Sequence, residues 1–161
     1  MRRNLLPIAI LAAATLVGWG ASTSGASDGD PAAIPRATAT ASAKPRLKLV
    51  DSAYGTILAN GRGRALYLFT ADRGKASRCY GDCATAWPPY IVKSKPAAGR
   101  GVKPGKIGTT RRSDGRLQAT YAGHPVYFYE DDNEPGEVLC QAVNEFGGYW
   151  YVLRSSGRAV R

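Results

Sequence analysis

The chain has 161 residues, with 22 Lys and Arg against 12 Asp and Glu and a formal net charge of +10. Residues 47–161 are the part rich enough in apolar side chains to fold, and their length excludes a second globular domain. Within them, residues 93–116 hold eight basic residues and one acid while the remainder is balanced, which assigns the excess positive charge to one loop.

Residues 1–26 have the organisation of a signal peptide. Arg2 and Arg3 precede the apolar run Leu5–Val17, and Ser24-Gly25-Ala26 offers the small residues that a signal peptidase reads. This run is shorter than the roughly 20 residues that cross a bilayer. We therefore expect export and removal of residues 1–26, with an uncleaved anchor as the alternative. No cysteine follows the run, so no lipid-attachment site is expected.

The segment 27–46 has the composition of a tether. It reads SDGDPAAIPRATATASAKPR, and Ile34 is its only large apolar side chain. Such a segment cannot bury enough apolar surface to offset the entropy of ordering, so it is predicted to be disordered.

Two segments of the domain resemble each other without a gap. GRALYLFTAD covers 63–72 and GHPVYFYEDD covers 123–132, and both have the order Gly, two residues, apolar, Tyr, apolar, aromatic, two residues, Asp. The offset between the two is the same at every position. A gapless match of this length indicates an internal duplication.

Each copy is predicted to be the second strand of a hairpin. Residues 54–59 precede the first copy across a glycine-containing turn at 60–63, and residues 117–121 precede the second across Ala122-Gly123. Alternation places Tyr67 and Phe69 on one face and Leu66 and Leu68 on the other, so both faces are apolar.

The remaining elements predict an all-β domain with one short helix. Residues 149–153 form a further strand, and a turn at 113–115 suggests another hairpin. Asp82 is predicted to cap a single helical turn at 83–87, which Pro88-Pro89 ends. The expected fold is a small sandwich or open barrel of two antiparallel hairpin repeats, at about 54–92 and 117–155.

These strings resemble a bacterial secreted-repeat lipoprotein family that is defined by a repeated Y-x-(F/W/Y)-x-x-D motif. The resemblance rests on YLFTAD and YFYEDD, on Cys79-Tyr80-Gly81-Asp82-Cys83, on Trp87-Pro88-Pro89 and on the Phe146-Gly147-Gly148 stretch before Trp150. It implies export, a cell-envelope location and tandem repeats, and it implies no reaction. The chain departs from the family pattern because it lacks a cysteine for lipidation.

The motif residues have a structural and a functional interpretation. They are Tyr67, Phe69 and Asp72 in the first copy, and Tyr127, Tyr129 and Asp132 in the second. The favoured interpretation is that each tyrosine packs in the core with its hydroxyl bonded, while each aspartate orders the following turn. The alternative is that Asp72 and Asp132 flank one cleft as ligands or as an acid/base pair, as in a hydrolase.

The three cysteines predict one disulfide in an exported protein. Cys79 and Cys83 are four residues apart and are expected to be bonded, which leaves Cys140, the repeat counterpart of Cys79, as an unpaired thiol. A bond from Cys140 to either of the others, which would join the repeats, is the rival pairing. With His124 as the only histidine, neither a metal site nor a cofactor is expected.

The basic segment 93–116 is a candidate anion-facing surface. Its cations are Lys93, Lys95, Arg100, Lys103, Lys106, Arg111, Arg112 and Arg116. Outside the cytoplasm the available partners are an acidic polymer, an anionic membrane surface or an envelope protein. Nucleic acid is not expected, because the segment contains no aromatic side chain for base stacking.

The sequence therefore predicts an exported cell-envelope protein that binds another envelope component or has a structural role. No nucleophile or phosphate-loop motif is present, so an enzyme is not favoured. A redox or small-ligand module that uses the cysteines and tyrosines is the first alternative, and a hydrolase that uses Asp72 and Asp132 is the second.

Overall fold

The computed structural model describes residues 44–161. The predicted signal peptide and residues 27–43 of the predicted tether lie outside the described residues. The predicted end of the tether at residue 46 lies too far along the chain, because Arg46 is already the first residue of strand β1 (Arg46–Ser52). There the alternation of basic and apolar residues in Arg46-Leu47-Lys48-Leu49 buries Leu47 and leaves Arg46 exposed.

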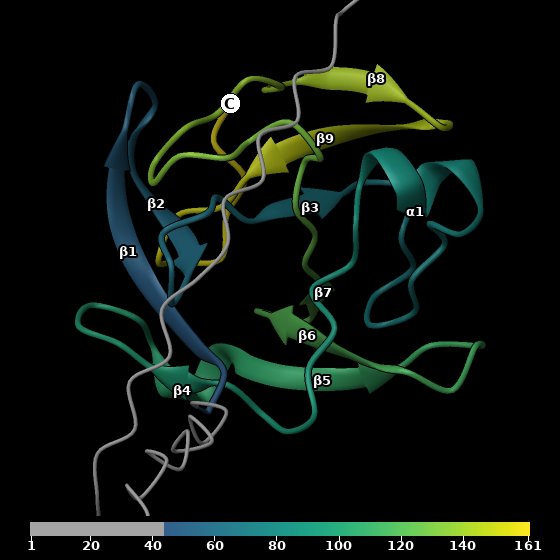
Figure 1. The fold of residues 1–161 in the computed structure, drawn as a ribbon, viewed down its shortest axis with the longest axis horizontal. Coiled ribbons are helices and arrows are strands. Elements are labelled where there is room, and N and C mark those ends of the chain that lie inside the picture. Colours follow the sequence, from purple (N-terminus) through teal and green to yellow (C-terminus); the bar gives the residue numbers. More distant parts are fainter. Residues whose placement is uncertain (1–43) are drawn as a thin grey trace, which may run out of the picture. The chain divides into compact units, whose positions relative to one another are not determined.

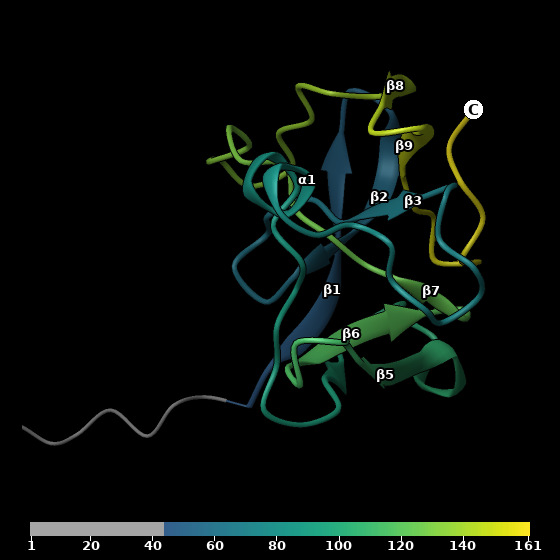
Figure 2. The same cartoon turned by 90° about the vertical axis from the view of Figure 1, so that its right-hand side faces the viewer.

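The strands form three small sheets, and the all-β prediction is confirmed. The first sheet contains β2 (Gly55–Asn60), β1 (Arg46–Ser52) and β4 (Ala97–Ala98), in that order. The second contains β3 (Tyr67–Phe69), β9 (Gly148–Val152) and β8 (Val143–Glu145). The third contains β5 (Ile107–Arg111), β6 (Leu117–Tyr121) and β7 (His124–Pro125). Figures 1 and 2 show the second sheet on one side of the domain and the third on the other, with β1 and β2 spanning between them.

The hairpin of the second copy forms as predicted. Strand β6 pairs antiparallel with β7 across Ala122 and Gly123, whose φ angles of 50° and 87° suit a two-residue hairpin turn. The hairpin predicted around 113–115 also forms, between β5 and β6. The strand predicted at 149–153 is β9, shifted by one residue.

The predicted hairpin of the first copy is largely wrong. Strand β2 pairs along its whole length with β1, and it meets the following segment only at a bridge between Ala59 and Ala65. The longer turn at 60–63 is held by the Asn60 side chain, which accepts the backbone N–H groups of Arg62 and Arg64. Beyond it β3 turns away from β2 and pairs with β9 instead.

The one α-helix within residues 44–161 is α1 (Asp82–Ala86), which begins one residue earlier than predicted. Asp82 is its first helical residue and not its N-cap, a position that Gly81 takes with φ 57°. Trp87 closes the helix by donating its backbone N–H to Cys83 O at 2.8 Å. A second short turn, the 3-10 helix η1 (Pro104–Lys106), lies within the segment 93–116. Since that segment also contains β4 and β5, it is not the single loop that the sequence suggested.

The core consists of two hydrophobic clusters, and β3 contributes side chains to both. Tyr67 and Phe69 point into one cluster and Leu66 and Leu68 into the other, as the alternation predicted. All four side chains are buried. Strand β3 is therefore covered on both faces, which explains why the first copy has no polar alternation.

Candidate functional site

The two copies of the motif meet at their tyrosines. The backbone N–H of Tyr67 donates to Tyr127 O at 2.9 Å, and the N–H of Tyr127 donates to Tyr67 O at 3.0 Å. This reciprocal pair joins equivalent residues of the two copies, so an approximate two-fold axis passes between them. Outside β7 the second copy has only isolated bridges, at Tyr127 to Tyr67 and to Pro89.

Each motif tyrosine bonds the aspartate of the other copy, and we call these two tyrosine–aspartate bonds the exchanged pair. The hydroxyl of Tyr67 donates to Asp132 Oδ2 at 2.5 Å, and the hydroxyl of Tyr127 donates to Asp72 Oδ2 at 2.8 Å. The second oxygen of each aspartate accepts a backbone N–H further along its own copy, from Arg78 at 2.8 Å and from Leu139 at 2.9 Å. Each aspartate thus bonds the opposite tyrosine and orders the turn that follows it.

Burial sets the acid–base behaviour of these groups. It raises the pKa of Asp72 to about 6 and also raises the pKa of Asp132, since both carboxylates lose water. It raises the pKa values of Tyr67 and Tyr127 too, so both hydroxyls remain donors. Asp132 has no exposed surface. The two aspartates therefore do not face one cleft as the hydrolase interpretation requires.

An aromatic column lies beside the exchanged pair. Trp87 and Trp150 stack with ring centroids 4.1 Å apart, and Trp150 stacks on Phe69 at 4.1 Å. Tyr67 meets Trp87 edge-on at 5.1 Å, and Tyr127 meets Trp150 edge-on at 5.2 Å. The two tryptophans are therefore repeat counterparts, although the spacing between them is longer than the spacing between the motif tyrosines.

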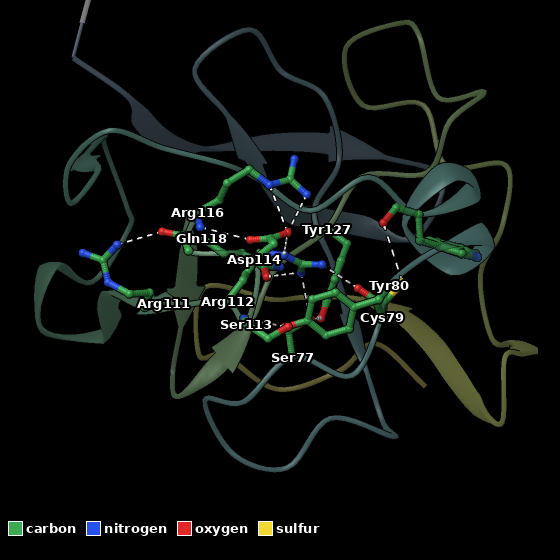
Figure 3. Close-up of polar contacts among 12 residues, drawn as sticks. Ser77, Cys79, Tyr80, Arg111, Arg112, Ser113, Asp114, Arg116, Gln118 and Tyr127 are labelled. Atoms are coloured by element: carbon green, nitrogen blue, oxygen red, sulfur yellow. Dashed lines mark hydrogen bonds and ion pairs between the residues drawn. The ribbon is translucent and has the colours of Figure 1, made fainter.

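The prediction that Arg112 faces an anion at the surface is wrong. Its side chain is buried, and all three nitrogens of its guanidinium donate hydrogen bonds to other residues of the protein, as Figure 3 shows. It donates to Cys79 O at 2.6 Å, to Ser77 Oγ at 2.8 Å and to Gln118 Oε1 at 2.7 Å, and it lies over the Tyr80 ring. Ser77 Oγ is also 2.8 Å from the Tyr127 hydroxyl, so Ser77 connects Arg112 to the motif tyrosine of the second copy.

The other seven residues of that set remain at or near the surface. Lys106 is half-buried, and the exposed members are Lys93, Lys95, Arg100, Lys103, Arg111 and Arg116. Arg116 forms an ion pair with Asp114 at 2.7 Å. Within residues 44–161, the only other ion pair joins Arg112 to the same aspartate. The remaining exposed cations of the segment have no carboxylate partner in the described part of the chain.

The cysteines have the favoured pairing. Cys79 and Cys83 form a disulfide, and Cys140 has no disulfide partner among the described residues. Both bonded residues are buried. Burial raises the pKa of the Cys140 thiol, which reduces the thiolate fraction and hence its reactivity.

Two cavities border the motif strands, and the sequence predicted neither. Cavity 1, of about 860 Å³, is lined by Asp72 and His124 and by three arginines of the C-terminal segment, Arg154, Arg158 and Arg161. Cavity 2, of about 1170 Å³, is lined by Lys44, Arg46, Arg62 and Arg64 with the rings of Tyr90 and Phe128. Both are cationic, so the positive charge is not confined to 93–116. They escape sequence analysis because each gathers residues from segments far apart in the chain.

Residues 44–161 contain no cluster of three or more His, Cys, Asp or Glu side chains placed to hold a metal ion. None of the helices described is long and apolar enough to cross a bilayer.

The fold and the exchanged motif define a two-repeat β protein whose copies interlock through tyrosines and aspartates. The chain belongs to the family described as a secreted repeat of unknown function, whose model matches residues 48–90 and 108–154, more than half of the sequence. This confirms the family resemblance seen in the sequence. Searches of curated proteins and of solved structures found no match.

Proposed function

We propose that the protein is an exported binding module that holds an acidic polymer of the cell envelope through the cations of the segment 93–116. One observation carries the proposal. Lys93, Lys95, Arg100 and Lys103 are exposed and have no carboxylate partner within the described residues. Cations that are neither paired nor buried can neutralise an external polyanion without first breaking an internal contact.

The exchanged motif supports this function by supplying a rigid platform. The hydroxyls of Tyr67 and Tyr127 bond the carboxylates of Asp132 and Asp72, and both tyrosine rings are buried, so we expect the surface charges to make the contacts with a ligand. The redox alternative gains little from a buried disulfide, and the hydrolase alternative gains little from aspartates that do not share a cleft.

The test is retention on an immobilised carboxylated polysaccharide during a salt gradient. The proposal expects elution above about 0.3 M salt, where the Debye length is only about 6 Å and unspecific attraction is screened. The double variant Lys93→Ala/Lys95→Ala should elute at clearly lower salt. The matched control is Arg73→Ala/Lys75→Ala, which removes two exposed cations from a turn outside the segment.

Two results would contradict the proposal. One is elution of the native protein below about 0.3 M salt, and the other is an equal effect of the two double variants. Tighter binding to vesicles that contain anionic lipid than to the polysaccharide would instead favour a membrane surface, and binding to neither would favour an envelope protein.

A further inference from the structure

The two cavities occupy equivalent positions in the two repeats. The bridges Tyr67–Val152 and Tyr127–Pro89 make Val152 the counterpart of Pro89. In the same way, Leu58 donates its N–H to Leu153 O and Ala119 donates its N–H to Tyr90 O. Leu153 and Tyr90 are therefore counterparts, and so are the residues that follow them, Arg154 and Ile91.

Three structural positions recur at both cavities. They are the residue after the glycine that opens each motif copy, the residue after the motif tyrosine, and the fourth residue after the stacked tryptophan. In cavity 1 these are His124, Leu68 and Arg154, and in cavity 2 they are Arg64, Phe128 and Ile91. The duplication has thus produced two related cavities.

The positive charge of the two cavities does not come from matching positions. Where cavity 1 has Arg154, cavity 2 has Ile91, and the two remaining arginines of cavity 1 lie in the C-terminal segment. Cavity 2 draws Lys44 and Arg46 from the start of the domain. A charge that recurs on different residues is not a simple consequence of copying the backbone, and it indicates a common requirement for an anion.

Cavity 2 combines a fixed guanidinium with apolar walls. The guanidinium of Arg64 lies 4.8 Å from the centroid of the Phe128 ring, and it donates to Tyr129 O, and to Glu130 O at 3.0 Å. Tyr90 packs against Phe128 at 5.1 Å. The apolar wall is completed by Pro89, Ile91 and Pro135, and no carboxylate of the described residues lines the cavity. Rings beside arginines suit a sugar that carries a carboxylate.

Cavity 1 has one carboxylate, and that group is already occupied. Asp72 accepts from the Tyr127 hydroxyl and from the Arg78 N–H, and within the described residues it forms no ion pair with the arginines of the cavity. Within the described residues Arg154, Arg158 and Arg161 form no ion pair. Leu68, Phe69 and Ala159 also line the cavity, and the first two are core residues with little exposed surface.

We infer that each cavity takes one carboxylated sugar residue, so that one molecule binds two segments of an acidic polysaccharide. This inference rests on the proposed function, since it takes the same polymer as the ligand and adds two sites for it to the segment 93–116. Two sites on one molecule would also allow it to cross-link polymer chains, with an avidity that neither site has alone.

The test is isothermal titration of the full chain with tetragalacturonate, a carboxylated probe too short to represent the polymer, and with uncharged cellotetraose. The expected stoichiometry is two tetragalacturonates per chain, with no heat from cellotetraose. Arg46→Ala/Arg62→Ala should remove the site at cavity 2, and Arg158→Ala/Arg161→Ala the site at cavity 1. Each variant should retain one site with its affinity changed less than about twofold, because the two sites do not share residues.

Avidity gives the second readout. Each cavity variant should lose at least about tenfold in apparent affinity for the long polysaccharide, because one of the two cavities no longer adds to the contacts made by the segment 93–116. The control Arg73→Ala/Lys75→Ala has the same net charge as either variant and should retain both sites. Unfolding curves of all variants show whether the exposed substitutions leave the fold intact.

The outcomes separate this inference from the proposed function. One site or none in the native protein, or two sites in either cavity variant, would overturn the inference while retention on the long polymer still supported the function. Two sites for tripolyphosphate and none for tetragalacturonate would overturn the carboxylated ligand. Failure of the native protein to bind the long polymer would overturn the proposed function itself.

Discussion

Replacing Tyr67 with Phe removes one hydroxyl from the exchanged pair and leaves the ring in place. The lost donor is 2.5 Å from Asp132 Oδ2, and Asp132 has no exposed surface through which water could replace it. Hydrogen bonds to a charged group contribute about 1.5–3 kcal/mol, and a buried partner left unsatisfied brings the loss to the upper part of that range. We expect Tyr67→Phe to lower the free energy of unfolding by about 2–3 kcal/mol.

The repeat counterpart supplies an internal control. Tyr127→Phe removes the same group opposite Asp72, which is only half-buried and can recruit water, so its cost should be nearer about 1 kcal/mol. Urea unfolding at pH 8, followed by tryptophan fluorescence, measures both. In a double-mutant cycle, Tyr67→Phe should cost less in an Asp132→Asn background, by about 1 kcal/mol or more. A cost for Tyr67→Phe below about 0.5 kcal/mol, the size of an ordinary surface substitution, would refute the reasoning. So would the absence of coupling to Asp132.

Three further changes test other parts of the structure. Because the pKa of Asp72 is raised to about 6 in the folded state, its contribution to the free energy of unfolding is present below about pH 4 and is lost as the pH rises through 6. The free energy of unfolding of Asp72→Asn, measured in urea, should therefore rise relative to that of the native protein between about pH 4 and pH 7. Arg112→Ala should cost about 3 kcal/mol or more in the same assay, while Arg116→Ala, whose side chain is exposed beside the same Asp114, should cost far less. Reduction of the bond between Cys79 and Cys83 should cost about 2 kcal/mol by loss of chain constraint, measured from melting with and without dithiothreitol.

The sequence was sufficient for the features that depend on local pattern. The period-two alternation around Tyr67 predicted which side chains face which cluster, and the Ala122-Gly123 turn predicted the hairpin that follows β6. The constant offset between the two motif copies identified the duplication. The motif also predicted that each aspartate orders the turn after it, because an aspartate side chain commonly accepts nearby backbone N–H groups.

Features that depend on non-local pairing were missed. Nothing in the spacing of either copy shows that Tyr67 bonds Asp132 and not its own Asp72. The equivalence of Trp87 and Trp150 was hidden because the offset between the copies changes outside the motif. Arg112 was grouped with the surface cations because composition cannot distinguish a solvated guanidinium from one enclosed by carbonyls and hydroxyls.

The strand partners were also decided by tertiary context. The sequence analysis predicts no strand at 46–52, so it pairs β2 with the segment that follows it, whereas in the structure β2 pairs with β1. The cationic cavities have no local signature, because most of their arginines come from the first and last segments of the domain. A pattern along the chain identifies faces of strands, whereas the surfaces that could bind a ligand depend on how those strands pack.

Native-state amide hydrogen exchange at Tyr67 and Tyr127 tests the central claim most directly, namely that the two copies fold as one interlocked unit. These amides form the reciprocal pair across the approximate two-fold axis. We predict that both exchange only by global unfolding, with the same opening free energy and among the slowest rates in the domain. Exchange of either amide through a separate, cheaper opening would contradict the claim, because it would show that one copy can detach while the other stays folded.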